Sequence, residues 1–201
     1  LVYDVSGRRG VIVFLFFGLG NPGRRYALPR HNVGFLFIDH MAKLGLRKTV
    51  QKRLYEAHLL EGEGKVYIAK PLTFMNLSGV AVRLLMKDLN FEKKDTLVLV
   101  YDDVWIPLGR MRIRESGSDG GHNGLKSVIS EIGTQSFPRI RIGVGPLPEN
   151  GDMVDYVLGK FSGDEYQKVS KVIGLAVSAA KELISGDIRK VMTAYNGTEV
   201  D

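Results

Sequence analysis

The sequence predicts a single α/β domain, built on a twisted, mostly parallel mixed β-sheet with helices on both faces. Short runs rich in β-branched and aromatic residues alternate with longer helix-like stretches along the chain. The 201 residues suffice for one full core, and no repeat, low-complexity tract or long linker divides them. Alternation of this kind favours parallel strands joined by helical crossovers.

Each expected element is a run of consistent character between turn residues. The expected strands are Val11–Phe17, Val66–Ala69, Thr96–Tyr101, Arg110–Arg114 and Ile140–Val144. The expected helices are Val33–Leu44, Met75–Leu89, Asn123–Ile132, Asp164–Ser185 and a short basic one, Asp187–Tyr195. Residues 1–10 are mixed in character and are interpreted as an upstream extension or an expression remnant, so that the domain itself spans residues 11–201.

Composition narrows the function. The net charge of +6 favours polyanionic partners, although a generic basic protein explains the charge equally well. The absence of cysteine excludes disulfides, thiolate catalysis and Cys-ligated zinc, and is typical of a reducing compartment, so we expect a cytoplasmic protein. The apolar run Val11–Leu19 is about half of the ~20 residues that a membrane span needs, so no membrane association is expected.

Polar side chains follow the strand-like runs, at a loop or at a helix start. They are Asn21, His31, Asn76, His122 and Asn123. The carboxyl ends of parallel strands meet at one edge of a sheet, so we expect these side chains to converge in one crevice. A histidine there can act as a general base. Because nothing near them resembles a covalent nucleophile, the pattern favours hydrolysis by an activated water.

Each of these residues also has a structural interpretation. Thr73 is a natural N-cap, and Asn76 three residues later either returns to that cap or polarises a carbonyl. His122 and Asn123 follow a glycine-rich loop and either cap a helix or cover a substrate. The other two histidines, His40 and His58, are interpreted as structural.

An acidic pair ends the strand Thr96–Tyr101. Asp102 could orient a histidine and stabilise its imidazolium form. Alternatively, Asp102 and Asp103 could join a histidine in a divalent metal site, although no spacing here matches a known ligand motif.

The segment Gly18–Gly23 matches the spacing of a dinucleotide-binding fingerprint, with Asp39 as a possible ribose ligand. The match is weak, because Pro22 and Pro29 delay the helix that would hold the pyrophosphate. A rigid turn that aims Asn21 into the crevice is the alternative.

Two strands carry arginines at every second position. Arg110, Arg112 and Arg114 alternate with apolar residues, and Arg139 and Arg141 flank Ile140. Such a row suits a phosphate backbone, and a solvated strand face explains either row alone about as well.

Taken together, these segments resemble the bacterial-type peptidyl-tRNA hydrolase family, from about Val11 to Tyr195. The matching segments are GLGNPGRRYALPRHNVGF (18–35), KPLTFMNLSG (70–79), YDDVWIPLGRMRIR (101–114), GSDGGHNGLKSVI (117–129), FPRIRIGVG (137–145) and VDYVLGKF (154–161). The resemblance implies hydrolysis of the ester between a peptide and the terminal ribose of tRNA, releasing both, without metal or cofactor. It also implies a monomer whose nucleic acid partner is peptidyl-tRNA.

The resemblance also assigns residues. His31 matches the base that activates water and Asp102 the acid that supports it. Asn21 and Asn76 match amides that position the water and bind substrate. The remaining positions that match the substrate crevice are Tyr26, Met75, His122 and Asn123. Those that match the tRNA phosphate site are Arg112, Arg114 and Arg141.

One alternative from a different functional class stays open, namely a catalytically inactive RNA-binding protein on the same fold. Three residues depart from the family pattern. Tyr101 and Trp105 stand where the family more often has a histidine and an acid, and Asp119 places a charge in a loop that is usually small and neutral.

Overall fold

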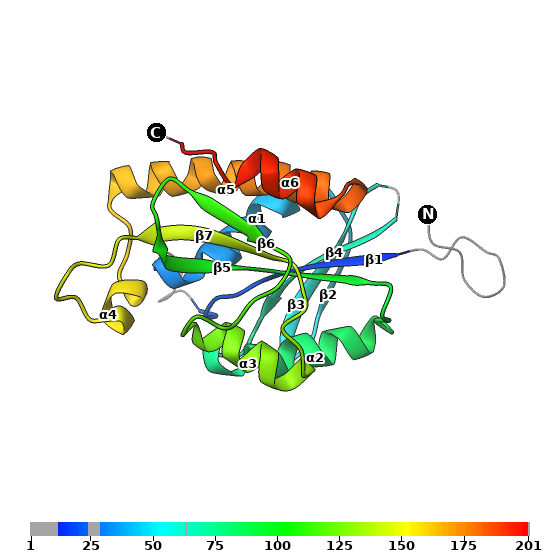
Figure 1. The fold of residues 1–201 in the computed structure, drawn as a ribbon. Helices are drawn as coiled ribbons and strands as arrows, with labels where there is room; N and C mark the ends of the chain where they lie inside the picture. The colour runs from blue at the N-terminus through cyan, green and yellow to red at the C-terminus, as the bar shows by residue number, and fades with distance from the viewer. Residues whose placement is uncertain (1–11, 24–28, 63, 201) are drawn as a thin grey trace.

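The computed structural model describes residues 12–23, 29–62 and 64–200, which form a seven-stranded sheet covered by helices (Figure 1). The strands are β1 (Val13–Gly18), β2 (Leu46–Gln51), β3 (Tyr55–Leu60), β4 (Lys65–Pro71), β5 (Thr96–Pro107), β6 (Met111–Arg114) and β7 (Arg139–Gly145). The helices are α1 (Val33–Ala42), α2 (Ser78–Asp88), α3 (Asn123–Ile132), α4 (Met153–Leu158), α5 (Gly163–Ser185) and α6 (Ile188–Tyr195). Two short 3-10 helices, η2 (Arg30–Asn32) and η3 (Met75–Leu77), precede α1 and α2.

The strand order is β2-β3-β4-β1-β5-β7-β6. The pairs β4–β1, β1–β5 and β5–β7 are parallel, whereas β2–β3, β3–β4 and β6–β7 are antiparallel. The central strand β1 is apolar on both faces, as strands buried between two helical layers are. The parallel strands therefore form the middle of the sheet, and their carboxyl ends share one edge.

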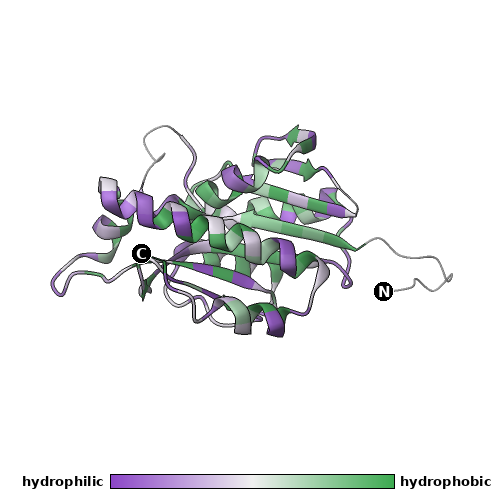
Figure 2. Cartoon of the chain, turned by 90° about the horizontal axis from the view of Figure 1, so that it is seen from above, coloured by the Kyte–Doolittle hydropathy of each residue, from purple (hydrophilic) through white to green (hydrophobic). Residues whose placement is uncertain are grey.

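Helices cover both faces of the sheet. In Figure 1, α1, α5 and α6 lie on one side and α2 and α3 on the other. Each layer closes its own apolar core, one around Phe16 and Phe37 and the other around Leu15 and Phe17. Figure 2 shows green central strands between helices of mixed colour, as expected for amphipathic helices on a buried sheet. None of the helices in the described part of the chain has the length and apolar character that a membrane span requires.

The predicted fold class is confirmed, and most expected elements are present within a few residues. Two strands and one helix were not predicted: β2, β3 and α4. Strand β2 (LRKTVQ) is polar and mostly exposed at the sheet edge, so it lacks the apolar alternation that marks a half-buried strand. The predicted cap at Thr73 is wrong, because Phe74 occupies the N-cap position of η3 and makes no side-chain cap. Val11 lies outside the described residues.

A close backbone contact fixes the turn after β1. A Cβ on Gly18 would lie 2.2 Å from the carbonyl oxygen of Gly34, and a Cβ on Gly34 would lie 2.4 Å from that of Leu19. Only glycine allows this approach. The contact holds the start of α1, and with it the preceding turn η2, against the end of the central strand.

Candidate active site

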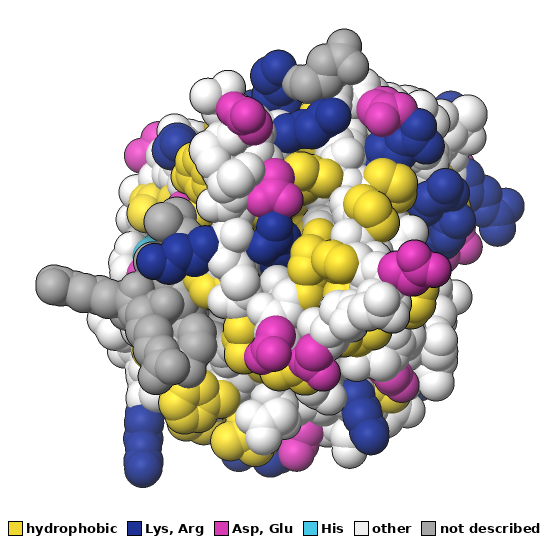
Figure 3. Space-filling view, turned by 90° about the vertical axis from the view of Figure 1, so that its left-hand side faces the viewer, with side chains coloured by type: hydrophobic (Ala, Val, Ile, Leu, Met, Phe, Trp, Pro, Cys, Tyr) yellow, Lys and Arg dark blue, Asp and Glu magenta, His cyan; other side chains and the backbone are white. Residues whose placement is uncertain are grey.

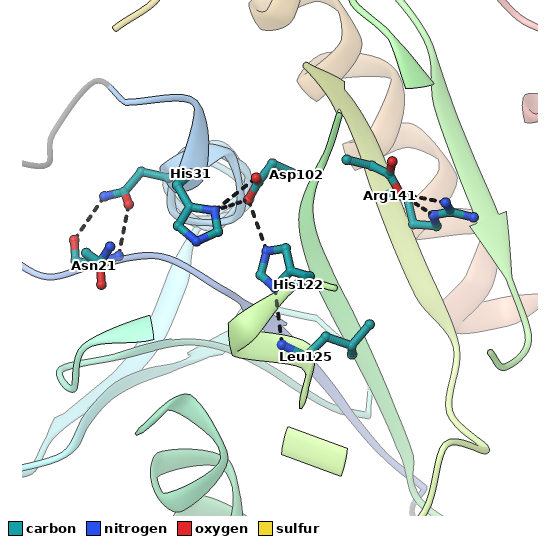
Figure 4. Close-up of polar contacts among 8 residues, drawn as sticks. Asn21, His31, Asp102, His122, Leu125 and Arg141 are labelled. Atoms are coloured by element: carbon teal, nitrogen blue, oxygen red, sulfur yellow. Dashed lines mark hydrogen bonds and ion pairs between the residues drawn. The ribbon is translucent and has the colours of Figure 1, made fainter. Parts of the chain in front are cut away.

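A histidine and an aspartate meet at the edge formed by the carboxyl ends of the parallel strands. His31 lies in η2, and its Nδ1 is 2.9 Å from both carboxylate oxygens of Asp102 on β5 (Figure 4). Both side chains are buried. Because a carboxylate only accepts hydrogen bonds, Nδ1 carries the proton and Nε2 has a free lone pair. Among the described residues, none forms a hydrogen bond with Nε2.

A second histidine binds the same carboxylate. His122 is the N-cap of α3; its Nδ1 accepts a hydrogen bond from the backbone N–H of Leu125 at 3.2 Å, and its Nε2 lies 3.2 Å from Asp102 Oδ1. Since a backbone N–H can only donate, the proton of a neutral His122 is on Nε2 and points to Asp102. The structural interpretation of His122 as a helix cap therefore applies, and the same ring also supports Asp102.

The pKa values of His31 and Asp102 are shifted by their surroundings. Burial acts to lower the pKa of His31, but the charge and the hydrogen bond of Asp102 outweigh it and raise the pKa above the ordinary 6.5. Burial acts to raise the pKa of Asp102, but the charges of His31 and His122 and their hydrogen bonds hold it well below its usual range. Asp102 is therefore ionised at neutral pH and stabilises a protonated His31.

Asn21 is locked beside this group. Its side-chain oxygen accepts from the backbone N–H of Met75 at 2.8 Å, while its backbone is paired with the side chain of Asn32 through two bonds of 2.9 Å. Asn32 follows His31 directly, so these bonds tie the turn after β1 to the histidine turn. Because the oxygen of Asn21 is occupied by a donor, its NH₂ group is the end left for a substrate.

The other predicted substrate residues differ in their burial and in their hydrogen bonds. Met75 is buried and contributes the backbone N–H that Asn21 binds. Asn76 and Asn123 have exposed side chains, and neither forms a hydrogen bond with a described residue. The capping-box interpretation of Asn76 is therefore wrong. Tyr26 lies outside the described residues.

A cavity of about 340 Å³ opens from the histidines toward the arginine-bearing strands. Its lining includes the buried His31 and Asp102 together with His122 and Asn123, and also Trp105, Arg114 and Arg141, which are more exposed than His31 and Asp102. Apolar side chains of α4 and the glycine-rich segment 116–121 complete the wall. The site thus links a buried proton-transfer group to a basic rim.

The arginines do not form one uniform row. Arg112 is exposed on β6, and Arg114 is half-buried at the cavity. Arg141 is bound by Asp103, with Nε 2.6 Å from Oδ2. Arg110 forms an ion pair with Glu199. Arg139 is 2% exposed and is not part of a phosphate-binding row.

The alternative of a metal site built from Asp102, Asp103 and a histidine is not favoured, since Asp103 is engaged by Arg141 and by the backbone N–H of Trp105. Ligand atoms of His31, Asp102 and His122 do lie within 4.8 Å of one another. However, a metal ion needs the lone pair of His122 Nε2, and the bond from Leu125 places a proton there. The cluster suits proton transfer better than metal binding.

The dinucleotide interpretation also fails. Gly18 and Gly20 serve close packing against α1, and Asp39 forms an ion pair with Lys70. The two remaining histidines are structural, as predicted. His40 binds the carbonyl of Leu36, and His58 lies between Thr49 and Glu56 on the edge hairpin.

Two buried residues near the site were not predicted. Arg30 binds both carboxylate oxygens of Glu165 at 2.7 and 2.8 Å and the carbonyl of Lys160 at 2.8 Å, with its guanidinium over the ring of Tyr156. Asn32 bridges to Asn21, as described above. Their signal in the sequence is weak, because both follow Pro29 as single polar residues at what looks like an ordinary helix start.

Comparison with known proteins agrees with this geometry. The family model "Peptidyl-tRNA hydrolase" matches residues 15–201. The peptidyl-tRNA hydrolase of Kosmotoga olearia is 53% identical over 190 residues, covering 94% of this chain and 100% of the relative, and that of Thermotoga maritima is 46% identical, covering 91% and 97%. The crystal structure of peptidyl-tRNA hydrolase from Acinetobacter baumannii matches with a TM-score of 0.85 at 31% identity, covering 93% of this chain and 96% of that one. The chain belongs to the peptidyl-tRNA hydrolase family.

Proposed function

We propose that the protein hydrolyses the ester that joins a peptide to tRNA, with His31 as the general base that activates the attacking water. The observation that carries this proposal is the arrangement of His31, whose Nδ1 is held by Asp102 and whose Nε2 is free. The family membership given above supports the same reaction.

In this mechanism, Nε2 of His31 takes a proton from water as the water oxygen attacks the ester carbonyl carbon. The positive charge that forms on the imidazole is stabilised by Asp102 through Nδ1–H. His31 then returns the proton to the departing ribose oxygen, so the products are a free peptide carboxylic acid and a tRNA with a free hydroxyl. General-base catalysis of this kind contributes ~10²–10⁴-fold.

The oxyanion of the tetrahedral intermediate requires a hydrogen-bond donor. We assign this to the NH₂ group of Asn21, whose orientation is fixed by the bond from Met75 to its oxygen. Asn76, which adjoins Met75, and Asn123, at the cavity, are exposed amides and are assigned to the peptide main chain. Met75, His122 and the undescribed Tyr26 complete the proposed substrate crevice.

The tRNA part of the substrate is assigned to the basic rim. Arg112 and Arg114 on β6 and Arg141 on β7 carry guanidinium groups near or at the cavity, where they can bind phosphates. Counter-charge from Asp103 reduces the share of Arg141, so Arg112 and Arg114 are expected to contribute more.

This function is favoured over the two alternatives. A catalytically inactive RNA-binding protein would have no need for an ionised Asp102 held between two histidines. A metal-dependent hydrolase conflicts with the proton on His122 Nε2. We further propose that the protein acts as a monomer in the cytoplasm, in keeping with the absence of cysteine. Sedimentation and cell fractionation test this.

The test is peptide release from an N-acetylated aminoacyl-tRNA in the presence of EDTA, for the parent protein and for His31→Ala. Rapid release by the parent and a loss of at least ~10²-fold in the variant are expected. If the parent is inactive but still binds the tRNA, the RNA-binding alternative is correct and the proposed hydrolysis is not. Equal rates for both proteins would show that His31 is not the base.

A further inference from the structure

Strand β5 carries a bulge at the rim of the cavity. Residues 104–106 of β5 lie opposite the single residue Val144 of β7, and Trp105 is the central residue of the three. Bulges next to active sites re-aim side chains. Here the flanking side chains, Val104 and Ile106, are buried at 8% and 4% exposure, while Trp105 is 71% exposed. The bulge therefore anchors two apolar side chains inward and projects the indole outward.

The bulge is held in place by its neighbours. A Cβ on Gly145 would lie 2.0 Å from the carbonyl oxygen of Val104, so the bulge contacts the backbone of β7 directly. The backbone N–H of Trp105 donates to Asp103 Oδ1 at 2.9 Å. The main chain at Trp105 is thus held by these contacts, while its side chain is largely exposed. An exposed tryptophan on a rigid support is the form that a binding platform takes.

The surroundings of Trp105 point to the kind of ligand. Trp105 lines the same cavity as the buried His31 and the half-buried Arg114 and Arg141. Figure 3 views the molecule from the side on which α4 lies, and apolar side chains are interspersed with Lys and Arg and with Asp and Glu on this face. An indole among guanidinium groups suits a flat, electron-rich ring attached to a phosphate.

We propose that Trp105 is a stacking platform for an unpaired nucleobase at the 3′ end of the tRNA. This inference rests on the proposed function, in which the ester lies at His31 and the tRNA phosphates at the arginines. A nucleotide chain joining these two places runs along the cavity that Trp105 helps to line, and stacking needs no hydrogen-bond readout, so it holds any base. Apolar peptide side chains are the competing ligand, and the basic rim disfavours them over a phosphate-linked ring.

The chain offers a direct measurement, because Trp105 is its single tryptophan. The fluorescence of Trp105, excited at 295 nm, is recorded while the parent protein is titrated with a tetranucleotide of adenosine. A second titration uses an abasic oligomer of the same length and charge. Saturable quenching by the first and little by the second is expected. Equal quenching by both, or none by either, overturns the proposal. Quenching by an N-acetyl dipeptide amide alone would assign Trp105 to the peptide instead.

Kinetics separate this proposal from the proposed function. On N-acetylated aminoacyl-tRNA, Trp105→Ala should raise KM roughly 5- to 100-fold with kcat within about threefold of the parent, and Trp105→Phe should restore most of the loss. If the parent is active and Trp105→Ala has the same KM as the parent, stacking is refuted and the proposed hydrolase function stands. An inactive parent would refute the hydrolase, whatever the fluorescence shows.

Discussion

Two histidine turns reach the same carboxylate and are held in different ways. His31 binds Asp102 through Nδ1 and leaves Nε2 free, whereas His122 uses Nε2 for Asp102 and Nδ1 for the backbone of Leu125. Both nitrogens of His122 are thus occupied. The difference shows why one ring suits proton transfer and the other suits support, although the two residues look alike in the sequence.

A buried arginine stands behind each turn. Arg30 supports the His31 turn through the carboxylate of Glu165. Arg139 supports the loop before His122 through the carbonyl of Ser118 at 3.0 Å, and it also binds the carbonyl of Gln135, after α3, at 2.9 Å. Among the described residues, no carboxylate pairs with Arg139. The catalytic turn therefore depends on an ion pair, and the supporting loop depends on neutral acceptors.

The largest effect is expected from Asp102→Asn, which keeps the shape of the shared partner and removes its charge. The amide NH₂ facing His31 would force a proton onto Nε2, and kcat should fall about 10²- to 10⁴-fold. In the parent, kcat should rise with pH through a pKa above 6.5, because only neutral His31 acts as base. In Asp102→Asn, burial still acts to lower the pKa of His31, but the charge that raises this pKa is gone. The residual activity should therefore titrate at a lower pH. An unshifted pH–rate profile would contradict the assignment.

The next effect concerns Asn21, which is tied to the His31 turn through Asn32. Asn21→Asp keeps an oxygen for the N–H of Met75 but loses the NH₂ donor, so kcat should drop by about 10²- to 10³-fold. Peptide release at saturating substrate measures this. The matched control is Asn76→Asp, whose exposed side chain should affect KM more than kcat. Equal loss of kcat in both would remove the distinction between the two amides.

A smaller effect is expected from the other histidine. His122→Ala removes one hydrogen bond to Asp102 and the cap of α3, but not the base, so kcat should fall roughly 10-fold. Loss of the cap should lower the free energy of unfolding by about 1 kcal/mol, measured by urea denaturation. A loss of activity as large as that of His31→Ala would mean that the two turns are catalytically equivalent.

The smallest effect on rate is expected from substitutions of Arg30 and Arg139, for which the free energy of unfolding is the more informative measurement. Arg30→Gln should lower the free energy of unfolding at pH 7 by about 1–3 kcal/mol, since it breaks a half-buried ion pair.

The pH dependence of this loss follows from Glu165. Burial acts to raise the pKa of Glu165, but hydrogen bonds from Ser162 and Arg30 and the charge of Arg30 lower it below 4.5. A lowered carboxyl pKa stabilises the fold above the unfolded value, and this stability is lost as pH falls. The gap between parent and Arg30→Gln should therefore narrow below pH 4.5. For Arg139→Gln, the difference in free energy of unfolding from the parent should stay constant with pH. If this difference also narrowed at low pH, the proposed distinction between the two arginines would be wrong.

Much of the site could be predicted, because its residues follow apolar strands. His31, Asp102 and Asn21 lie together at the carboxyl ends of the parallel strands, where the sequence predicted that they would meet. What could not be predicted depends on tertiary contacts. Arg139 looked like a surface residue by its period-two spacing, yet the segment leading to His122 and the ring of Phe137 bury it. Strand β2 gave no signal because five of its six residues are exposed and only Val50 is partly buried, so no regular apolar alternation marks it.

The pairing of β1 with β5 has a consequence for the lifetime of activity. His31 follows β1 and Asp102 lies on β5, its neighbour in the middle of the sheet. Central strands generally exchange their amide hydrogens only when the whole molecule opens, so we expect this of β1 and β5, whereas we expect the edge hairpin β2–β3 to fray locally. Partial melting at the edge would leave the catalytic pair assembled. Heat should therefore abolish turnover in a single cooperative step that coincides with global unfolding.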